Sequence, residues 1–222
     1  MKKTSWIIGI DEVGRGALAG PVAVAVLVAP QEFKIKNSEL RIAKLAKLKD
    51  SKKLTAKQRE VWFKWIKGQA LPHAVAFVSP TIIDKINVSQ AANLAATRAF
   101  ERLIWSLRQW RGSPSAAKFR IKNYLVFLDG GLYLKDSRFK NYDLRIKTKT
   151  IIRGDEKIPA ISLASIVAKV SRDKYMKKLH KKYPRYDFIH NVGYGTKKHI
   201  KAIKKYGFLP IHRRSFCKNF LN

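Results

Sequence analysis

Continuous apolar runs open the chain. Trp6 to Ile10 and Ala19 to Val28 are rich in β-branched residues, and Gly14, Gly16 and Gly20 lie between them. This pattern predicts two strands joined by a tight, glycine-bearing connection. A connection so short requires the two strands to be antiparallel.

Strand and helix patterns alternate along the rest of the chain. Short apolar runs predict strands at 73–78, 124–128 and 144–152, and 3.6-residue periodicity predicts helices that begin at Thr55 and at 89–110, 160–182 and 196–206. The residues expected to face the core are Trp62, Trp65, Ile66, Ala96, Phe100, Leu103, Ile104, Leu107, Ile161, Ala164, Ala168, Tyr175 and Leu179. This order predicts an α/β fold with a mixed sheet flanked by helices and a helical C-terminal portion.

The length favours one domain. The 222 residues are enough for one sizeable core, and the loop-like stretch from Gly112 to Arg120 is too short to be a domain linker. We therefore expect a single domain over residues 1–222, with its core at about 6–216. A Lys-rich stretch at 34–53 is expected to be an exposed loop.

The charge is strongly positive. Forty-seven Lys and Arg residues against fifteen acids give a formal net charge of +32, which predicts attraction to polyanions such as nucleic acid. A solvated or membrane-attracted cationic surface is the alternative. One cysteine, Cys217, excludes an intramolecular disulfide and fits a reducing cytoplasm. No run of about 20 apolar residues is present, so we expect a cytoplasmic protein without a membrane span.

Four acids follow predicted strands in this acid-poor chain. Asp11 and Glu12 follow the first strand, Asp129 follows the run at 124–128, and Asp155 follows the run at 144–152. Residues just beyond strand ends converge on one crevice in open α/β sheets, and four carboxylates there would suit Mg²⁺ or Mn²⁺. Two such ions can activate the attacking water and stabilise the leaving oxygen of a phosphodiester. Asp129 in a turn and Asp155 at a helix cap are the structural alternatives.

Several ordered motifs carry a family resemblance. They are GIDEVGRG at 9–16 with LAGP at 18–21, DSKKL at 50–54, LDG at 128–130, GD at 154–155, ASIVAKVSRD at 164–173, GYGT at 193–196 with His199, and LPIHRRSF at 209–216. With these motifs the chain resembles ribonuclease HII over nearly its whole length. It departs from the usual family pattern at Val13, Leu163 and Val192.

The resemblance implies a ribonuclease H fold and an endoribonuclease. Such an enzyme would cut the RNA strand of RNA/DNA hybrids and nick duplex DNA 5′ of an embedded ribonucleotide by two-metal catalysis, leaving 5′-phosphate and 3′-hydroxyl ends. It implies that the metal-binding catalytic residues are Asp11, Glu12, Asp129 and Asp155, and that substrate contacts come from Gly14, Arg15, Gly16, Ser51, Lys52 and Tyr194. The backbone of the Gly14–Gly16 segment would lie near the ribose 2′-hydroxyl.

Two questions stay open at this point. Asp173 and His199 match family positions, and we expect supporting roles for them, with Asp173 able to pair with a nearby Arg. The competing hypothesis is a non-catalytic basic nucleic-acid-binding protein whose carboxylates are structural. It explains the charge but not the placement of four acids. A monomer is the default expectation.

Overall fold

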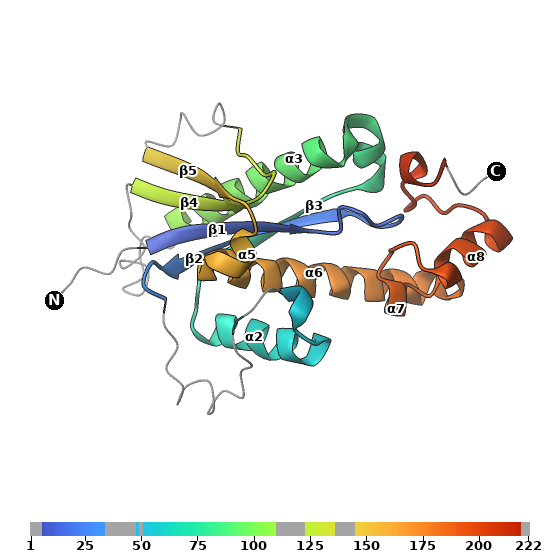
Figure 1. Ribbon diagram of the computed structural model, residues 1–222, viewed down its shortest axis with the longest axis horizontal. Coiled ribbons are helices and arrows are strands. Elements are labelled where there is room, and N and C mark those ends of the chain that lie inside the picture. The colour runs from blue at the N-terminus through green and yellow to red at the C-terminus, as the bar shows by residue number, and fades with distance from the viewer. Residues whose placement is uncertain (1–5, 34–47, 49–50, 110–122, 136–144, 219–222) are drawn as a thin grey trace.

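The computed structural model describes residues 6–33, 48, 51–109, 123–135 and 145–218 (Figure 1). The strands are β1 (Trp6–Val13), β2 (Val22–Pro30), β3 (His73–Val78), β4 (Asn123–Asp129) and β5 (Arg145–Ile151). The α-helices are α2 (Ala56–Gly68), α3 (Pro80–Gln109), α5 (Gly154–Lys157), α6 (Pro159–Lys182), α7 (Phe188–Asn191) and α8 (Lys197–Tyr206). The described residues also form the 3₁₀ turns η1 (Ser51–Lys53), η5 (Pro184–Tyr186) and η6 (Arg214–Phe216). The predicted strands and helices within these ranges are confirmed, with shifted ends.

The sheet is mixed, as predicted. Its strand order is β3-β2-β1-β4-β5. The first three strands in sequence form antiparallel pairs, and β4 and β5 extend the sheet in parallel with β1. The carboxyl ends of β1, β4 and β5 therefore lie at the same edge, which is where the predicted acids fall.

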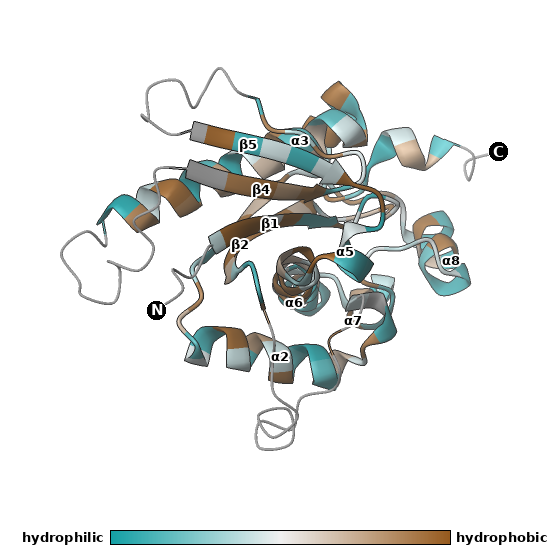
Figure 2. Ribbon diagram, turned by 60° about the vertical axis from the view of Figure 1, so that its left-hand side comes forward, coloured by the Kyte–Doolittle hydropathy of each residue, from teal (hydrophilic) through white to brown (hydrophobic). Residues whose placement is uncertain are grey.

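Helices cover both faces of the sheet (Figures 1 and 2). Alternate residues of β2 point to opposite faces of the sheet, because successive side chains in a strand point in opposite directions. Val22, Val24 and Val26 belong to the core cluster under α3, whereas Ala25 and Leu27 belong to the cluster under α6 and α2. With both faces covered, this strand is apolar throughout.

The start of α6 lies directly against β1. A Cβ atom at Gly9 would fall 2.2 Å from the carbonyl carbon of Ala160, so only glycine allows this approach. The contact places the first turns of α6 beside the strand that carries Asp11.

Strand β1 is longer than predicted. Asp11, Glu12 and Val13 continue its antiparallel pairing with β2, while its pairing with β4 stops at Ile10. Asp11 and Glu12 thus still pair with β2, but they lie beyond the last residue of β1 that pairs with β4. Strand β2 begins at Val22 instead of Ala19, so the connection spans residues 14–21.

Helix α3 has two segments. It begins at Pro80, before the predicted start, and is interrupted at Asn87, which has φ 63° and ψ 165°. The Asn87 side chain accepts a hydrogen bond from the backbone N–H of Gln90 at 3.0 Å, the geometry of an N-cap. The periodicity detected the second segment, whose inward Phe100 and Leu103 are buried as predicted.

The inward face of α6 differs from the prediction in its second half. Ile161, Ala164 and Ala168 are buried as expected, but Tyr175 is 39% exposed and Met176 is fully buried. Tyr175 instead stacks on Phe77, with ring centroids 5.4 Å apart. At this point the helix also packs on the C-terminal portion, whose core cluster contains Met176, so a different face becomes buried.

The C-terminal portion has a small core of its own. Leu18 and Ala19 of the β1–β2 connection pack there with Met176, Phe188 and Cys217. No helix among the described residues is long and apolar enough to cross a membrane. The loop expected at 112–120 and most of the one expected at 34–53 lie outside the described residues. At its described end the exposed-loop prediction is wrong for Ser51, which is 3% exposed and begins the 3₁₀ turn η1.

Candidate active site

Three carboxylates meet at the edge of the sheet. Asp11 and Glu12 belong to β1, and Asp129 is the last residue of the neighbouring parallel strand β4. One oxygen from each side chain lies within 4.8 Å of the other two. The register explains this, because Ile10 pairs with Leu128 and the acids come next on both strands. The predicted convergence of these three residues is observed.

Asp11 is the buried member of the group. Its side chain is 4% exposed, and burial, followed by the charge of Glu12, raises its pKa well above the ordinary value of 3.8. Asp129 raises this pKa further, while hydrogen bonds from the Ser165 side chain and the Glu12 N–H lower it. The fold thus concentrates negative charge where little water can solvate it. A hard divalent cation with oxygen ligands fits this set of donors.

Asp155 lies close to this group but outside it. It is buried in the first turn of the four-residue helix α5, and the 4.8 Å group does not include it. The preceding residue, Gly154, donates its N–H to Asp129 Oδ1 at 2.7 Å. Three of the four predicted acids are therefore gathered tightly, with the fourth adjacent in the chain to a hydrogen-bond partner of Asp129.

The β1–β2 loop, residues 14–21, borders the carboxylates. Arg15 Nη1 lies 3.3 Å from Glu12 Oε1, and Nη2 donates to Ser89 Oγ of α3 at 3.4 Å. Gly14 is buried and Gly16 is exposed. The predicted substrate-binding segment is thus next to the acids and offers exposed backbone.

Ser51 lies behind Asp11. It is 3% exposed, and its hydroxyl is 2.7 Å from that of Ser165, which also hydrogen-bonds to Asp11. The adjacent Lys52 belongs to η1, and its side chain lies outside the described residues. The hydroxyl of Ser51 is thus part of a buried Ser51–Ser165–Asp11 chain.

Tyr194 lies in the segment that joins α7 to α8. Its ring is half-buried, and the guanidinium carbon of Arg172 is 5.5 Å from the ring centroid. The carbonyl of Tyr194 accepts a hydrogen bond from His199 Nδ1 at 2.9 Å. Tyr194 therefore contacts Arg172 of α6 through its ring and His199 of α8 through its backbone carbonyl.

Comparison with known proteins gives one consistent family. The family profile described as Ribonuclease HII matches residues 8–219. Ribonuclease HII of Endomicrobium trichonymphae is 43% identical over 210 residues, covering 95% of this chain and 84% of the relative. That of Polynucleobacter asymbioticus is 40% identical over 212 residues, covering 96% and 93%. The chain belongs to the ribonuclease HII family.

Solved structures agree with this assignment. Ribonuclease H2 from Pyrococcus horikoshii OT3 has a TM-score of 0.61 and 26% identity, with 97% of each chain covered. The Archaeoglobus fulgidus ribonuclease HII, solved in complex with PCNA, has a TM-score of 0.62 and 23% identity over 94% of each chain, and supports the fold alone. As a ribonuclease HII, the protein is a ribonuclease H, a hydrolase that acts on RNA paired with DNA.

The structure gives partners to the two residues whose roles were open. Asp173 pairs with Lys169 at 2.8 Å and with Arg59 Nη2 at 3.7 Å, so the pairing with a nearby Arg that the sequence left open is observed. Arg59 in turn donates to the carbonyls of Ser51 and Leu54. Asp173 therefore supports the segment that carries Ser51.

His199 belongs to a buried relay. The Leu209 N–H donates to His212 Nδ1 at 2.8 Å, so His212 carries its proton on Nε2 and donates it to His199 Nε2 at 3.1 Å. His199 can then donate from Nδ1 to the Tyr194 carbonyl. Burial lowers the pKa of both histidines, that of His212 to about 4, which keeps the relay neutral.

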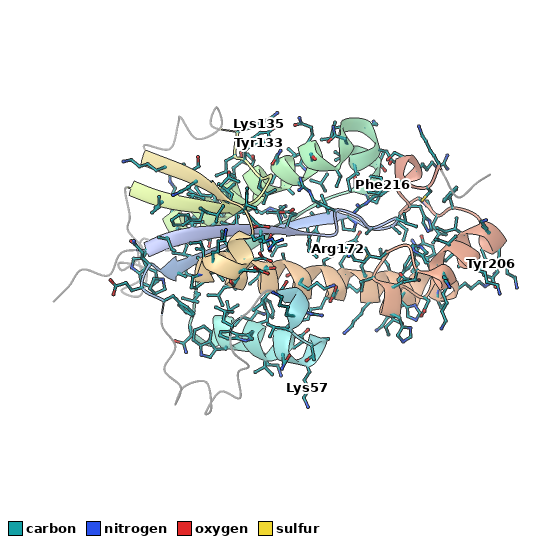
Figure 3. The ribbon with its side chains drawn as sticks, viewed as in Figure 1. Lys57, Tyr133, Lys135, Arg172, Tyr206 and Phe216 are labelled. Atoms are coloured by element: carbon teal, nitrogen blue, oxygen red, sulfur yellow. The ribbon has the colours of Figure 1, made fainter. Side chains whose placement is uncertain are left out.

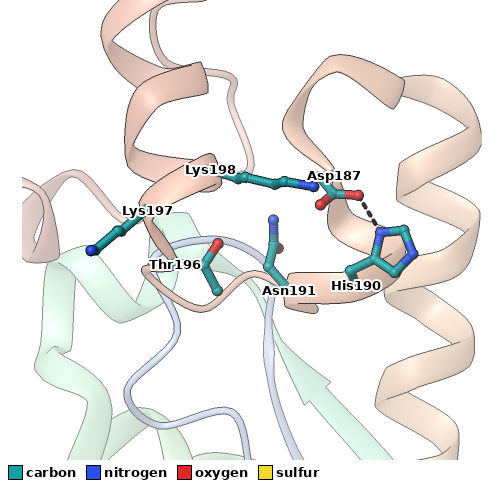
Figure 4. Close-up of a pocket in the computed structure, with 6 residues that line it drawn as sticks. All are labelled: Asp187, His190, Asn191, Thr196, Lys197 and Lys198. Carbon is teal, nitrogen blue, oxygen red and sulfur yellow. Dashed lines mark hydrogen bonds and ion pairs between the residues drawn. The ribbon is translucent and has the colours of Figure 1, made fainter.

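Sequence reasoning missed Ser165, Arg172, His212 and Arg213. All four stand in the family motifs, but nothing in their spacing showed that they contact the loops of the site. A cavity of about 380 Å³ lies elsewhere, between α7 and α8 (Figure 4). Its lining includes the Asp187–His190 pair and Lys198 but none of the clustered carboxylates, so it is not the centre of the chemistry.

Proposed function

We propose that this ribonuclease H cuts the RNA strand of RNA/DNA hybrids and also nicks duplex DNA 5′ of an embedded ribonucleotide. The products would carry 5′-phosphate and 3′-hydroxyl ends. The observation that carries the proposal is the group of Asp11, Glu12 and Asp129 beside the exposed backbone of the β1–β2 loop. A phosphodiester next to a 2′-hydroxyl could be held at both places at once.

The carboxylates would hold Mg²⁺ or Mn²⁺. Asp11, Glu12 and Asp129 would bind the ions, with Asp155 as a ligand at the margin of the site. When bound, two divalent ions lower the pKa of a water nucleophile and stabilise charge on the leaving oxygen. Ser165 and the Gly154 N–H hold the Asp11 and Asp129 carboxylates in place, so these ligands are oriented before substrate arrives.

Substrate recognition is assigned to three segments. Gly14, Arg15 and Gly16 would contact the ribonucleotide through their backbone near the 2′-hydroxyl, and Tyr194 would pack on the sugar at the RNA–DNA junction. Phosphate contacts are assigned to Ser51 and Lys52. Because the Ser51 hydroxyl is already bonded to Ser165, we expect Ser51 to contribute through its backbone.

The charge supports a nucleic-acid substrate. Helix α8 exposes Lys197, Lys198, Lys201, Lys204 and Lys205, and the whole chain has a net charge of +32. Phosphate neutralisation releases counterions, so binding should weaken steeply with salt. The same surface would also serve a binding protein without catalysis, which makes turnover the deciding observation.

A gel assay tests the proposal. Labelled duplex DNA with one ribonucleotide is incubated with Mg²⁺, Mn²⁺ or chelator, beside an RNA/DNA hybrid and an all-DNA duplex. We expect a single metal-dependent nick 5′ of the ribonucleotide and no cut in the all-DNA duplex. Binding to all duplexes without a metal-dependent product would instead identify a non-catalytic binding protein.

A further inference from the structure

Two arginines are completely buried between α6, the β1–β2 loop and the C-terminal segment. Arg172 of α6 and Arg213, which precedes η6, are both 0% exposed. Figure 3 labels Arg172 near the middle of the molecule, where α6 passes the end of β1 and β2. A guanidinium keeps its charge at neutral pH, so burying two of them is strongly unfavourable unless their nitrogens find hydrogen-bond acceptors.

Arg172 joins the two segments assigned to substrate recognition. Nε donates to the Pro21 carbonyl at 2.9 Å, and Nη2 donates to the Ala19 carbonyl at 3.2 Å. Nη1 donates to the Val192 carbonyl at 2.9 Å, two residues before Tyr194, whose ring lies over the guanidinium. One side chain therefore fixes the β1–β2 loop relative to Tyr194.

Arg213 holds the same loop from the C-terminal side. Nε and Nη2 donate to the Gly20 carbonyl at 3.0 and 2.9 Å, and Nη1 donates to the Arg15 carbonyl at 2.6 Å. Its own backbone N–H donates to the Leu18 carbonyl at 2.8 Å. The carbonyl of Arg15 is thus held by a group that takes no part in the carboxylate cluster.

Backbone carbonyls, and not carboxylates, accept these bonds. Among the described residues, neither guanidinium is within 4.0 Å of a carboxylate oxygen. An ion pair would tolerate many geometries, whereas six directed bonds from two planar forks specify the position of each carbonyl. The arrangement fixes the path of the loop instead of adding charge pairing.

The backbone on both sides of Arg172 has unusual conformations. Val192 has φ 43° and ψ 32°, a left-handed conformation that β-branched residues rarely adopt. Gly14 has φ 89°, and a Cβ there would lie 2.2 Å from Arg172 Nε. The strain at Val192 persists only where surrounding contacts enforce it, and such strain is frequent at functional sites.

We propose that Arg172 and Arg213 are positioning residues that set the geometry between the β1–β2 loop and Tyr194, and through it the selectivity for a single embedded ribonucleotide. This inference rests on the proposed function. A long hybrid offers a ribose at every position and tolerates a displaced loop. A lone ribonucleotide offers one productive register, so it depends on that geometry.

Arg172→Lys and Arg213→Lys test the inference, because each keeps the positive charge and removes the fork. We compare kcat and KM on a duplex with one ribonucleotide and on an RNA/DNA hybrid. We expect the single-ribonucleotide kcat/KM to fall about ten- to a hundredfold, and the hybrid value to fall much less. Arg102→Lys is the matched control, because exposed Arg102 also donates to a backbone carbonyl, that of Val75, away from the site.

Two further readouts separate positioning from general destabilisation. Mn²⁺ affinity should be unchanged in both variants, and amide exchange should accelerate at residues 14–20 and 193–194. If one of the two variants does not fold, the other still tests the inference, because each arginine is replaced separately. Equal losses on both substrates, or none, with wild-type Mn²⁺ affinity would overturn the inference. If the wild-type protein cuts neither substrate, the proposed function itself fails.

Discussion

The molecule holds two clusters of like charge, each with at least one buried member, and their partners differ. The anionic cluster of Asp11, Glu12 and Asp129 sits at the sheet edge, and burial with mutual repulsion raises the pKa of Asp11. The cationic cluster of Arg172 and Arg213 sits beneath the β1–β2 loop, and backbone carbonyls accept from both guanidiniums.

The difference indicates what each cluster is for. Burial lowers the pKa of Arg213 to about 9, so it stays charged at neutral pH, and its donors are used within the protein. At Asp11 the carboxylates keep a net repulsion that its hydroxyl and amide donors do not cancel, although Arg15 pairs with Glu12. A buried cation with a carbonyl acceptor for each of its guanidinium nitrogens organises structure, whereas repulsion among carboxylates is relieved by a ligand of opposite charge.

Replacing a member of the anionic cluster should have the largest effect. We expect Asp11→Asn to lower kcat by about a thousandfold or more, because metal assistance contributes several kcal/mol to such reactions. Without metal, the same variant should be more stable than wild type at pH 7, by about 1 kcal/mol, since it removes the repulsion. Activity assays and urea melts in chelator measure the two effects.

Asp187→Asn is the matched control. Asp187 has φ 55°, a conformation that asparagine also tolerates, and it pairs with exposed His190 away from the carboxylates. This variant should keep wild-type activity. The stability gain of Asp11→Asn should vanish in acid, where wild-type Asp11 is protonated; a gain that persists at low pH would contradict the repulsion.

A substitution in the cationic cluster should lower the free energy of unfolding, whereas Asp11→Asn should raise it. Arg172→Met leaves the carbonyls of Ala19, Pro21 and Val192 without their donor, and we expect a loss of about 3–5 kcal/mol of unfolding free energy. Arg102→Met, which removes one exposed bond to a carbonyl, should cost less than about 1 kcal/mol. Similar losses in the two variants would refute the distinction. Denaturant melts decide between them.

The neutral histidine relay predicts a pH dependence. The pKa of His212 falls from 6.5 to about 4 on folding, so the unfolded chain binds the extra proton as the pH drops. Its contribution to stability is full above pH 6.5 and is lost between 6.5 and about 4, by up to about 3 kcal/mol. His212→Asn, which can still accept from the Leu209 N–H, should flatten this part of the stability curve. An unchanged slope would show that the histidine is not the cause.

The smallest effect is expected at Asp173. Its partly buried pairs with Lys169 and Arg59 should make Asp173→Asn cost about 1 kcal/mol, together with a modest loss of activity through the Ser51 segment. Glu60→Gln removes an exposed pair with Lys174 and should cost less than about 0.5 kcal/mol. Thermal melts and the hybrid-cleavage assay compare these variants. Equal effects would indicate that burial of the pair is unimportant.

Local patterns in the sequence were sufficient for most of the fold. Strand β3 was predicted residue for residue, and α2 has its N-cap at Thr55, the expected start, where Thr55 and Gln58 form a capping box. The periodicity of apolar residues predicts the buried face of a helix wherever the helix packs on the same neighbours along its whole length. It failed at Tyr175 because α6 changes neighbours there, a tertiary event that periodicity within the helix does not contain.

The candidate site was predictable only in part for the same reason. Adjacent acids at strand ends indicated Asp11, Glu12 and Asp129, since strand order brings such positions together. The contacts of Ser165, Arg172 and Arg213 join residues 150 or more positions from their partners in several cases, and no local spacing encodes them. Likewise, the burial of the Ser51 hydroxyl follows from the packing of η1 on α6.

Mn²⁺ titration followed by thermal melting tests the central claim most directly. A ligand that binds only the folded state raises the melting temperature. Wild type and Arg172→Lys should show the same Mn²⁺-dependent rise, and Asp11→Asn should show little or none. An equal rise in Asp11→Asn would contradict the account, because the buried anionic cluster would then not be the metal site.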